Sequence, residues 1–378
     1  MRIGIDLSVL KQSRTGIGNY AFNLSQALPK RGSGHEFIFF GGPKGAIPFF
    51  SRHVSYARQI QKENLDVFHG PANVLPLGFP YLTSLRRATG DISPRQGRVA
   101  GTMTRSVITL HDLAIYRHPE WFPKGQWLAT KLIVPASIRK ASKIIAPSQA
   151  TKKDLIELFR VPGEKIIVIP HGVEPRFFKE SGISNSQFPI LNQFSMSKFS
   201  KPYILFVGTL EPRKNIERIV DAYADLPKDI LERYDLVLAG RKGWNDRDIL
   251  LKIGKEKIKV LPDITNDQLP ELYQNAALFV YPSLYEGFGL PILEAMAAGA
   301  PVITSNTSSM PEVAAGAAIL VYPLHTGEIA ATMEQILNKK TLADQLSMSG
   351  IARARHFTWG ETAKRTIAVY ESVFRDYA

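Results

Sequence analysis

The sequence predicts an α/β protein with two domains, each built on a parallel β-sheet. Its 378 residues exceed what one hydrophobic core usually serves. Short apolar runs alternate with helical segments in both halves, a pattern typical of sheets whose faces are covered by helices. Between the halves lies a stretch rich in serine and asparagine that has no clear periodicity, which indicates a linker.

Six apolar runs in each half have the length of buried strands. In the first half they lie at residues 2–7, 36–41, 65–68, 106–110, 143–146 and 166–169. In the second half they lie at residues 203–207, 235–239, 258–261, 277–281, 301–304 and 318–321. Helices fit between most of these runs, for example at 215–225, 267–275 and 290–298. Alternation of this kind predicts parallel strand order in both sheets.

These runs define the expected domain boundaries. We expect a first domain over residues 1–180, a linker over 181–201 and a second domain over 202–356. Residues 357–378 have an amphipathic helical pattern and are expected to pack back toward the first domain.

Positive charge is concentrated in the first half. Residues 1–190 contain 26 Lys and Arg against 12 Asp and Glu, whereas residues 191–378 contain 21 against 22. The net charge of +13 therefore predicts a polyanionic partner for the first half, either an anionic membrane surface or nucleic acid. No helix-turn-helix pattern or aromatic-interleaved RNA motif accompanies the charge, which disfavours nucleic acid.

The composition also bears on the compartment. Cysteine is absent, so neither disulfides nor a thiolate metal site can form, and a reducing cytoplasm is expected. Asp6 interrupts the apolar N-terminal run, which fits a first strand better than a signal peptide. No run approaches the roughly eighteen apolar residues of a membrane-spanning helix. We expect a cytoplasmic protein that is either soluble or peripheral on the inner face of the membrane.

A glycine-bearing turn in the second half has the features of an anion site. The segment SLYEGFGLPILEAMAAGAPVI, which begins at Ser283, leads from a strand into a helix. Gly287 and Gly289 would let backbone amides approach a phosphate, and the helix N-terminus adds its positive dipole end. Glu286 and Glu294 could accept hydrogen bonds from sugar hydroxyls. The alternative is an ordinary strand–helix turn with solvated glutamates.

A second polar cluster follows an earlier strand of the same half. In YILFVGTLEPRKNIERIV, residues 203–220, Gly208 ends the strand and Arg213 and Lys214 precede a helix. Cations just past the carboxyl end of a parallel strand lie where α/β sheets bind ligands, and a diphosphate would suit them. A solvated pair of charges at a helix start is the alternative.

Three segments together resemble glycosyltransferase family 4, whose members have two Rossmann-like domains facing across a cleft (the GT-B fold). They are GTLEPRKN at 208–215, LVLAGRKGW at 236–244, and the Glu286-to-Glu294 pattern followed by SNTSSMPEV at 305–313. The resemblance covers nearly the whole chain. It implies that Arg213 and Lys214 hold the diphosphate of a nucleotide-sugar donor and that Glu286 binds hydroxyls of the transferred sugar.

The same resemblance implies further donor contacts in the second half. Backbone amides from Phe288 to Leu290 would meet the phosphates, and Glu294 would take the ribose hydroxyls. Ile264, which follows Pro262 and Asp263, falls where the family meets the nucleobase through its backbone.

In the first half, TGIGNY at 15–20 resembles the family's glycine loop, so Gly16 and Gly18 are expected against the donor phosphates. TLHDL at 109–113 places His111 where the family keeps a histidine close to the transferred sugar, with Asp112 orienting the loop. Taken alone, two glycines fit a plain turn and a lone histidine fits a structural role.

The family resemblance implies retention of anomeric configuration. No carboxylate is obviously placed as a covalent nucleophile, so we expect a front-face displacement in which the departing diphosphate helps to deprotonate the acceptor. Neither a cofactor nor a metal is expected. The triplet Asp246, Arg247 and Asp248 looks like a metal-binding DxD motif, but its place at a helix start favours N-capping.

The donor expected from EPRKN and LAGRKGW is GDP-mannose, because these segments look like those of bacterial lipopolysaccharide and exopolysaccharide mannosyltransferases. A UDP-sugar donor is the alternative, and a nucleotide-sugar epimerase or a phosphorylase on the same fold is a further one. Two departures from the family concern the rim of the site, where Gly316-Ala317-Ala318 and Tyr322 replace acidic residues that are common there.

The acceptor is expected to be a glycan or a lipid-linked glycan. Five arginines near residues 78–105 carry much of the first half's charge: Arg86, Arg87, Arg95, Arg98 and Arg105. Downstream, Trp121, Phe122 and Trp127 alternate with cations, which suits a membrane interface. The alternative is that these aromatic residues are core and the arginines are solvated.

Overall fold

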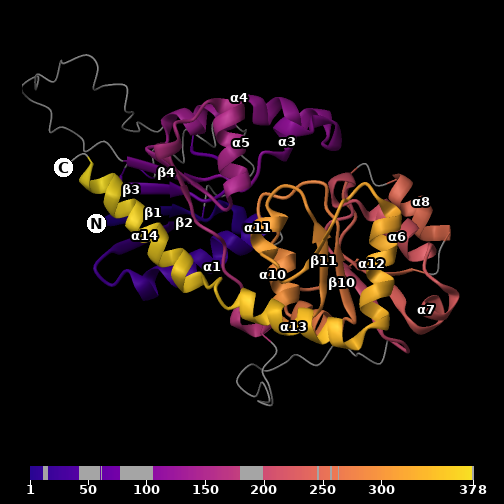
Figure 1. Ribbon diagram of the computed structural model, residues 1–378. Helices are drawn as coiled ribbons and strands as arrows, with labels where there is room; N and C mark the ends of the chain where they lie inside the picture. The colour runs from indigo at the N-terminus through magenta and orange to yellow at the C-terminus, as the bar shows by residue number, and fades with distance from the viewer. Residues whose placement is uncertain are drawn as a thin grey trace, which may run out of the picture. The chain divides into compact units, whose positions relative to one another are not determined.

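The computed structural model describes residues 1–11, 16–41, 60, 62–76, 105–178, 199–244, 247–255, 258–262 and 264–376. The chain forms two compact units (Figure 1). The first contains Met1–Leu113, Gly125–Gly172 and Trp359–Ala378, and the second contains Ala114–Lys124 and Val173–Thr358. Most of the expected linker, residues 181–201, lies outside the described residues.

The first unit is built on a parallel sheet with the described strand order β2-β1-β3-β4-β5-β6. Its strands are β1 (Arg2–Asp6), β2 (Glu36–Phe40), β3 (Val67–Gly70), β4 (Arg105–Thr109), β5 (Lys143–Ala146) and β6 (Ile166–Val168). Its helices include α1 (Gly16–Arg31), α4 (Lys124–Lys140), α5 (Gln149–Phe159) and α14 (Trp359–Arg375). Strands β1, β3, β4 and β5 are apolar and mostly buried because helices cover a parallel sheet, whereas the edge strand β2 has Phe39 exposed.

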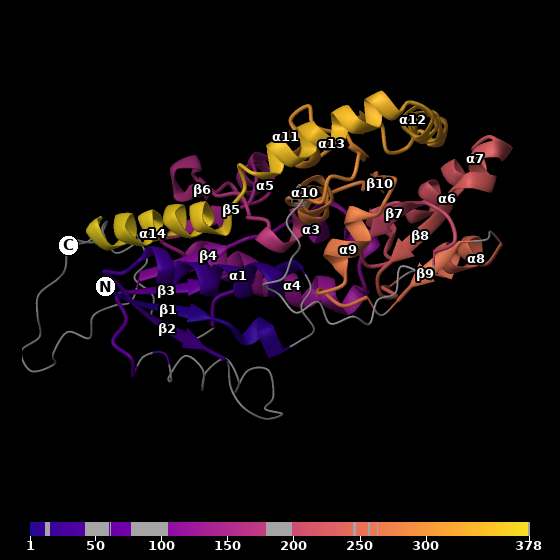
Figure 2. The same ribbon diagram turned by 90° about the horizontal axis from the view of Figure 1, so that it is seen from below.

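Helix α14 completes the core of this unit. It packs against α1 and against strands β3 and β4 (Figure 2). Ile367 and Tyr370 of α14 join the buried cluster formed by Tyr20 and Leu24 of α1 and Ile5 of β1. The end of the chain therefore supports the sheet that carries His111.

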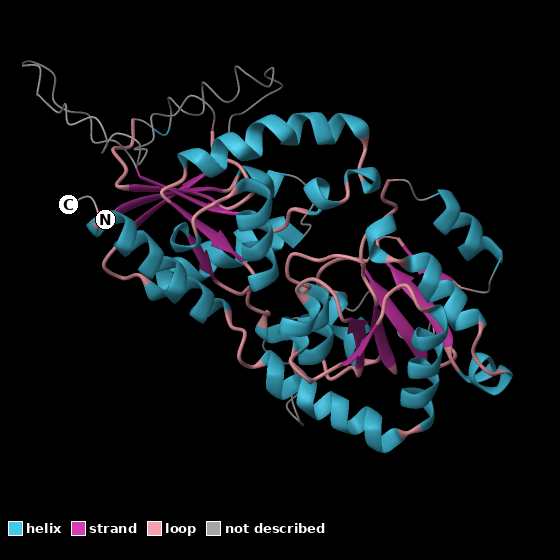
Figure 3. Cartoon of the chain, turned by 45° about the horizontal axis from the view of Figure 1, so that its top comes forward, coloured by secondary structure: helices cyan, strands magenta, loops and turns pink. Residues whose placement is uncertain are grey.

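The described strands of the second unit have the order β12-β11-β10-β7-β8-β9, again with parallel pairing. Figure 3 shows the strands of both units in magenta and the helices around them in cyan. The strands are β7 (Tyr203–Val207), β8 (Asp235–Ala239), β9 (Lys259–Leu261), β10 (Leu278–Tyr281), β11 (Val302–Ser305) and β12 (Ile319–Val321). Strands β8 and β9 lie on one side of β7, and strands β10, β11 and β12 lie on its other side. The strand order therefore reverses between β7 and β10, which makes this place a topological switch point. Ligands bind at such points, at the carboxyl ends of the strands.

Helices cover this second sheet. Helix α6 packs against both α8 and α12, while α10 packs against α9, α11 and α13. Their bounds are α6 (Ile216–Ala224), α7 (Lys228–Arg233), α8 (Arg247–Lys255), α9 (Leu269–Gln274), α10 (Leu290–Ala297), α11 (Met310–Ala314), α12 (Thr326–Asn338) and α13 (Lys340–Ala354). The α/β class and both parallel sheets expected from the sequence are confirmed, with strand ends within about two residues of the apolar runs.

One short segment belongs to the second unit, although the residues on both sides of it in the sequence belong to the first. Ala114–Lys124, which holds α3 (Ala114–Arg117) and a 3-10 turn (Pro119–Trp121), is part of the second unit. The indole N–H of Trp244 donates to the carbonyl of Trp121 at 2.6 Å, and the rings of Phe122 and Trp244 lie 5.8 Å apart. Trp121 and Phe122 thus pack within the second unit.

Candidate functional site

Two glycines bring neighbouring backbones together at the carboxyl ends of β7 and β8. A Cβ atom on Gly240 would lie 1.9 Å from the carbonyl oxygen of Gly208. One on Gly243 would lie 2.5 Å from the carbonyl oxygen of Leu210. Only glycine permits approaches this close, which explains the spacing of LVLAGRKGW and sets the course of the chain toward Arg213.

Arg213 and Lys214 share one buried carboxylate. They lie in a 3-10 turn, Pro212–Lys214, that follows β7, whereas Glu286 lies in the loop after β10. The Lys214 ammonium donates to Glu286 Oε1 at 2.5 Å, and the Arg213 guanidinium donates to Glu286 Oε2 at 2.9 Å. Arg213 and Lys214, which are predicted to bind the diphosphate, therefore lie next to Glu286, which is predicted to bind the sugar, at the switch point.

The charge state of this cluster follows from its contacts. Burial alone would raise the pKa of Glu286, but its ion pairs with Arg213 and Lys214 outweigh burial and hold that pKa at about 2. Burial also lowers the pKa of Lys214, with Arg213 acting in the same direction. Glu286 is thus an ionised carboxylate that accepts hydrogen bonds across the physiological range.

Two residues that the sequence analysis did not identify complete the cluster. Tyr281, the last residue of β10, accepts a hydrogen bond from Lys214 at 2.5 Å and donates one to Glu286 at 2.9 Å. Glu211 pairs with Arg213, with 2.6 Å between Oε1 and Nε. Glu211 and Tyr281 are two and five residues from predicted site residues, but neither position has a recognisable local pattern.

The glycine loop is held from behind by serine hydroxyls. Ser309 shares its hydroxyl hydrogen between the carbonyls of Glu286 and Phe288, with oxygen–oxygen distances of 2.9 and 2.8 Å, and Ser308 also donates to the Glu286 carbonyl. In a planar trans peptide the N–H points opposite to the C=O, so the amides of Gly287 and Gly289 point away from these serines. The serines of SNTSSMPEV therefore hold in place a turn that is lined by backbone amides.

Helix α10 begins at the end of this turn. Gly289 has φ 100°, a left-handed conformation that glycine adopts without strain, and Pro291 occupies the first turn after Leu290. The helix N-terminus, with its positive dipole end, therefore directly follows the amides of Gly287 and Gly289 in the chain. Such an end is suited to a phosphate group.

Glu294 lies one turn further along α10 and is buried. It accepts a hydrogen bond from Tyr273 of α9 at 3.0 Å. Burial raises its pKa to about 7; the Tyr273 hydrogen bond opposes this shift, Glu174 adds to it and Arg176 opposes it. Ile264 lies half-buried in the segment between β9 and α9. Glu294 therefore contacts helix α9, which follows Ile264, the predicted nucleobase contact, along the chain.

In the first unit, His111 lies at the carboxyl end of β4, as expected from TLHDL. Its ring Nε2 is 2.7 Å from the carbonyl of Pro71, which can only accept, so Nε2 carries a proton. Burial lowers the pKa of His111 despite this bond and the nearby Asp112, which keeps the ring neutral. A neutral ring with a protonated Nε2 has an acceptor lone pair at Nδ1.

A buried cluster surrounds this histidine. The Tyr20 ring meets the rings of His111 and His171 at centroid distances of 4.7 Å each. The Tyr20 hydroxyl lies 3.0 Å from Thr109 Oγ1, which lies 2.8 Å from His69 Nε2, and His69 Nδ1 lies 2.6 Å from the Tyr370 hydroxyl. Hydrogen bonds thus connect the end of β4 to helix α14.

The glycines expected in a loop of the first half lie at the start of a helix, and their contact with the donor phosphates stays a prediction. Gly16 and Gly18 lie in the first turn of helix α1, which begins at Gly16. The sequence pattern resembled a loop, but the apolar spacing of Tyr20, Leu24 and Leu28 against the sheet extends the helix back to Gly16. Residues 12–15 lie outside the described part of the chain.

Other predicted positions fall outside the described residues. They are Asp246, the side chains of Arg247 and Asp248, the side chain of Trp127, and the arginines Arg86, Arg87, Arg95 and Arg98. Arg105 opens β4, and its guanidinium lies 5.1 Å from the centre of the Phe374 ring.

Among the described helices, none is long and apolar enough to cross a membrane.

Two family models match the chain. Glycosyltransferase Family 4 matches residues 14–177, and Glycosyl transferases group 1 matches residues 191–353. The chain is 34% identical over 274 residues to the O-antigen chain mannosyltransferase B of Escherichia coli, covering 71% of each chain. A serotype-specific mannosyltransferase of E. coli, WbdA, is 32% identical over 240 residues, but the chain spans only 29% of its length.

Solved structures share the fold along the whole chain. Sucrose-phosphate synthase of Thermosynechococcus elongatus superposes with a TM-score of 0.75 at 20% identity and covers 100% of both chains. HepE of Anabaena, solved with UDP-glucose, has a TM-score of 0.69 at 19% identity and covers 98% of this chain and 99% of its own. Two parallel-sheet domains of this kind define the GT-B class of glycosyltransferases. Together with the E. coli relative, the matches show that the chain belongs to glycosyltransferase family 4.

Proposed function

We propose that this glycosyltransferase moves mannose from GDP-mannose onto a glycan or lipid-linked glycan, with retention of anomeric configuration and without a metal. The observation that carries the transfer chemistry is the buried cluster of Arg213, Lys214 and Glu286 at the switch point. The mannosyl donor is supported by the names of the E. coli relatives.

The cluster suits a departing diphosphate. As the glycosidic bond breaks, negative charge grows on the leaving phosphate, and Arg213, Lys214 and the amides at the start of α10 would neutralise it. Each well-placed donor of this kind stabilises a transition state by about 3 kcal/mol. Fixed protein cations in this position supply the charge that a metal ion provides in other transferases.

Retention without a covalent intermediate is supported by the state of Glu286. Both of its oxygens accept charged hydrogen bonds, from Arg213 and Lys214, so neither oxygen is free to act as a nucleophile without breaking an ion pair. Glu286 would instead accept hydrogen bonds from hydroxyls of the transferred sugar. The acceptor hydroxyl would attack on the face that the diphosphate leaves, and a phosphate oxygen would take its proton.

The nucleobase is tested by calorimetric titration of the purified protein with GDP, UDP and ADP. We expect GDP to bind at least about tenfold more tightly than UDP, a difference of roughly 1.4 kcal/mol. Preference for UDP would replace GDP-mannose by a UDP-sugar, the donor class that HepE binds. An epimerase would instead convert the donor without an acceptor, and a phosphorylase would require inorganic phosphate.

A further inference from the structure

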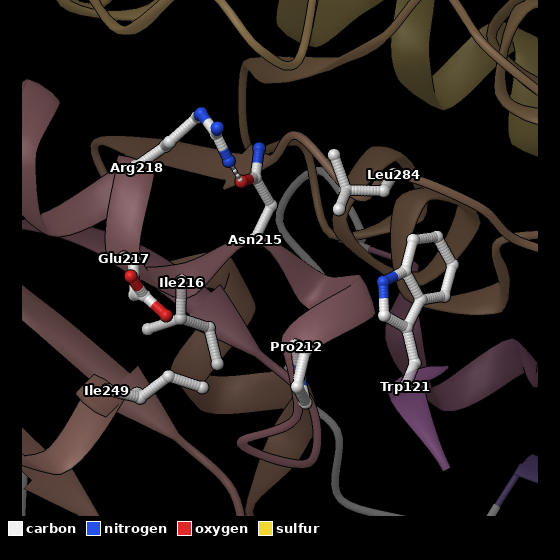
Figure 4. A pocket seen from close by; sticks show the side chains of 8 residues that line it. All are labelled: Trp121, Pro212, Asn215, Ile216, Glu217, Arg218, Ile249 and Leu284. Atoms are coloured by element: carbon white, nitrogen blue, oxygen red, sulfur yellow. Dashed lines mark hydrogen bonds between the residues drawn. The ribbon is translucent and has the colours of Figure 1, made fainter. Parts of the chain in front are cut away.

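A pocket of about 190 Å³ lies in the second unit beside the cluster of Arg213, Lys214 and Glu286. It is lined by Trp121, by residues 212 and 215–218, and by Ile249 and Leu284 (Figure 4). Leu284 N–H donates to the carbonyl of Arg213 at 2.8 Å, so the chain that forms one wall is tied directly to the proposed donor site.

The pocket combines an apolar wall with polar groups. Pro212 and Leu284 supply half-buried apolar surface, Ile216 and Ile249 are fully buried in the wall, and Glu217 and Arg218 lie at the start of α6. The Glu217 side chain is 43% exposed and 4.0 Å from Lys252, so its carboxylate remains accessible. The Arg218 guanidinium uses Nη1 to bond Asn215 at 2.9 Å, which leaves other donors of the group for a ligand.

Trp121 supplies the aromatic side of the pocket. His118 stacks on one face of its ring at 3.9 Å, with 16° between the ring planes. Figure 4 shows the ring nitrogen on the side that faces Asn215 and Pro212. Within the described residues, none accepts a hydrogen bond from this N–H. Because the indole N–H is only a donor, it can bind a hydroxyl oxygen in the pocket.

We infer that this pocket binds one hexose unit of the acceptor glycan. A pyranose has apolar C–H faces that suit the ring of Trp121 and the proline and leucine walls, and hydroxyls that suit Glu217, Arg218 and the indole N–H. The volume is smaller than the roughly 300–1,000 Å³ of sites for drug-sized ligands, which matches a single ring. This inference rests on the proposed transfer to a glycan and adds a second contact for that glycan, outside the reacting cluster.

The inference is tested by measuring the binding of α-linked mannotriose with saturation-transfer NMR and with tryptophan fluorescence. Glu217→Gln, Arg218→Gln and Trp121→Phe should each weaken binding at least about fivefold and raise the KM for the acceptor glycan. The kcat at saturating acceptor and the affinity for GDP should stay within about twofold of wild type. Trp121→Phe keeps the backbone carbonyl that Trp244 uses, so folding should survive.

Arg233→Gln is the matched control, because Arg233 lies on α7 of the same unit and pairs with Asp229. Wild-type affinity in all three pocket variants would overturn the inference, as would failure of the wild-type protein to bind mannotriose. Failure of the proposed function looks different. The protein would then bind mannotriose through the pocket but transfer no mannose from GDP-mannose.

Discussion

At the scale of single residues, the cluster around Glu286 explains why two cations precede a helix in EPRKN. Lys214 is buried, and a buried ammonium is stable only with partners, which Glu286 and Tyr281 supply. A solvated charge pair, the alternative reading of the sequence, would be exposed. The burial of Lys214 therefore favours a built site over a solvated pair.

Replacing either cation should lower turnover more than donor affinity. In Arg213→Ala or Lys214→Ala, we expect kcat to fall by about two to three orders of magnitude, because these charges act most strongly as the phosphate leaves. Steady-state kinetics with varied donor measures this. Lys259→Ala, which removes the ion-pair partner of Asp235 in the same unit, is the control. A rise in KM with kcat intact would contradict the assignment.

Glu294 should make nucleotide binding depend on pH. Its pKa of about 7 means that the free protein holds a proton there below neutrality, whereas ribose hydroxyls donate more strongly to an ionised carboxylate. GDP affinity should therefore rise as the pH increases from 6 to 8. Glu294→Gln should bind more weakly and lose this part of the slope, whereas the titration of GDP's own phosphate remains in both proteins. An identical pH profile in wild type and variant would remove Glu294 from the ribose site.

His111 should act on transfer and not on nucleotide binding. The variant His111→Ala should retain GDP affinity close to that of wild type while transfer nearly disappears, because the ring is expected to meet the sugar. His35→Ala is a suitable control, since His35 pairs with Glu371 in the same unit. Full transfer activity in His111→Ala would give His111 a structural role instead.

At the scale of elements, the strands could be predicted because buried parallel strands are continuous apolar runs bounded by turn residues. The turn at Gly287–Gly289 and the start of α10 were predictable for a similar reason, since glycine and proline have strong local preferences. Glu211 and Tyr281 were missed because neither position has a recognisable local pattern, and Ser309 because its contacts with Glu286 and Phe288 join segments distant in sequence. Gly16 and Gly18 were assigned to a loop because a pair of glycines has no fixed local meaning.

The support of the glycine turn gives an element-scale prediction. Ser309→Ala removes the hydroxyl hydrogen that is shared between the carbonyls of Glu286 and Phe288, so unfolding free energy should fall by about 1–3 kcal/mol. GDP affinity should fall as well, because the amides of the turn lose their fixed direction. Chemical denaturation and calorimetry measure the two effects. Ser372→Ala, on α14, is the comparison, and a stability loss with unchanged GDP affinity would separate the turn from the phosphates.

At the scale of the whole molecule, the excess of positive charge in the first half is not needed for the donor cluster, which lies in the second unit. We expect the protein to sediment with anionic vesicles at low salt and to be released at high salt, since each cation near such a surface contributes about 1 kcal/mol until it is screened. Glutamine at Arg86, Arg87, Arg95 and Arg98 should reduce sedimentation, whereas Arg105 is left unchanged because it packs on Phe374 in the first unit. Trp121 and Phe122 are engaged within the second unit, so the arginines carry this prediction. Equal sedimentation with neutral vesicles would contradict it.

The central claim is mannosyl transfer by fixed protein charges with retention. The most direct measurement incubates the purified protein with GDP-mannose, a mannose-containing acceptor glycan and excess EDTA, and identifies the new linkage by NMR. We expect release of GDP and an α-linked mannose in the product, formed at the same rate with and without the chelator. A β-linked product, or activity that EDTA abolishes and Mg²⁺ or Mn²⁺ restores, would contradict the account.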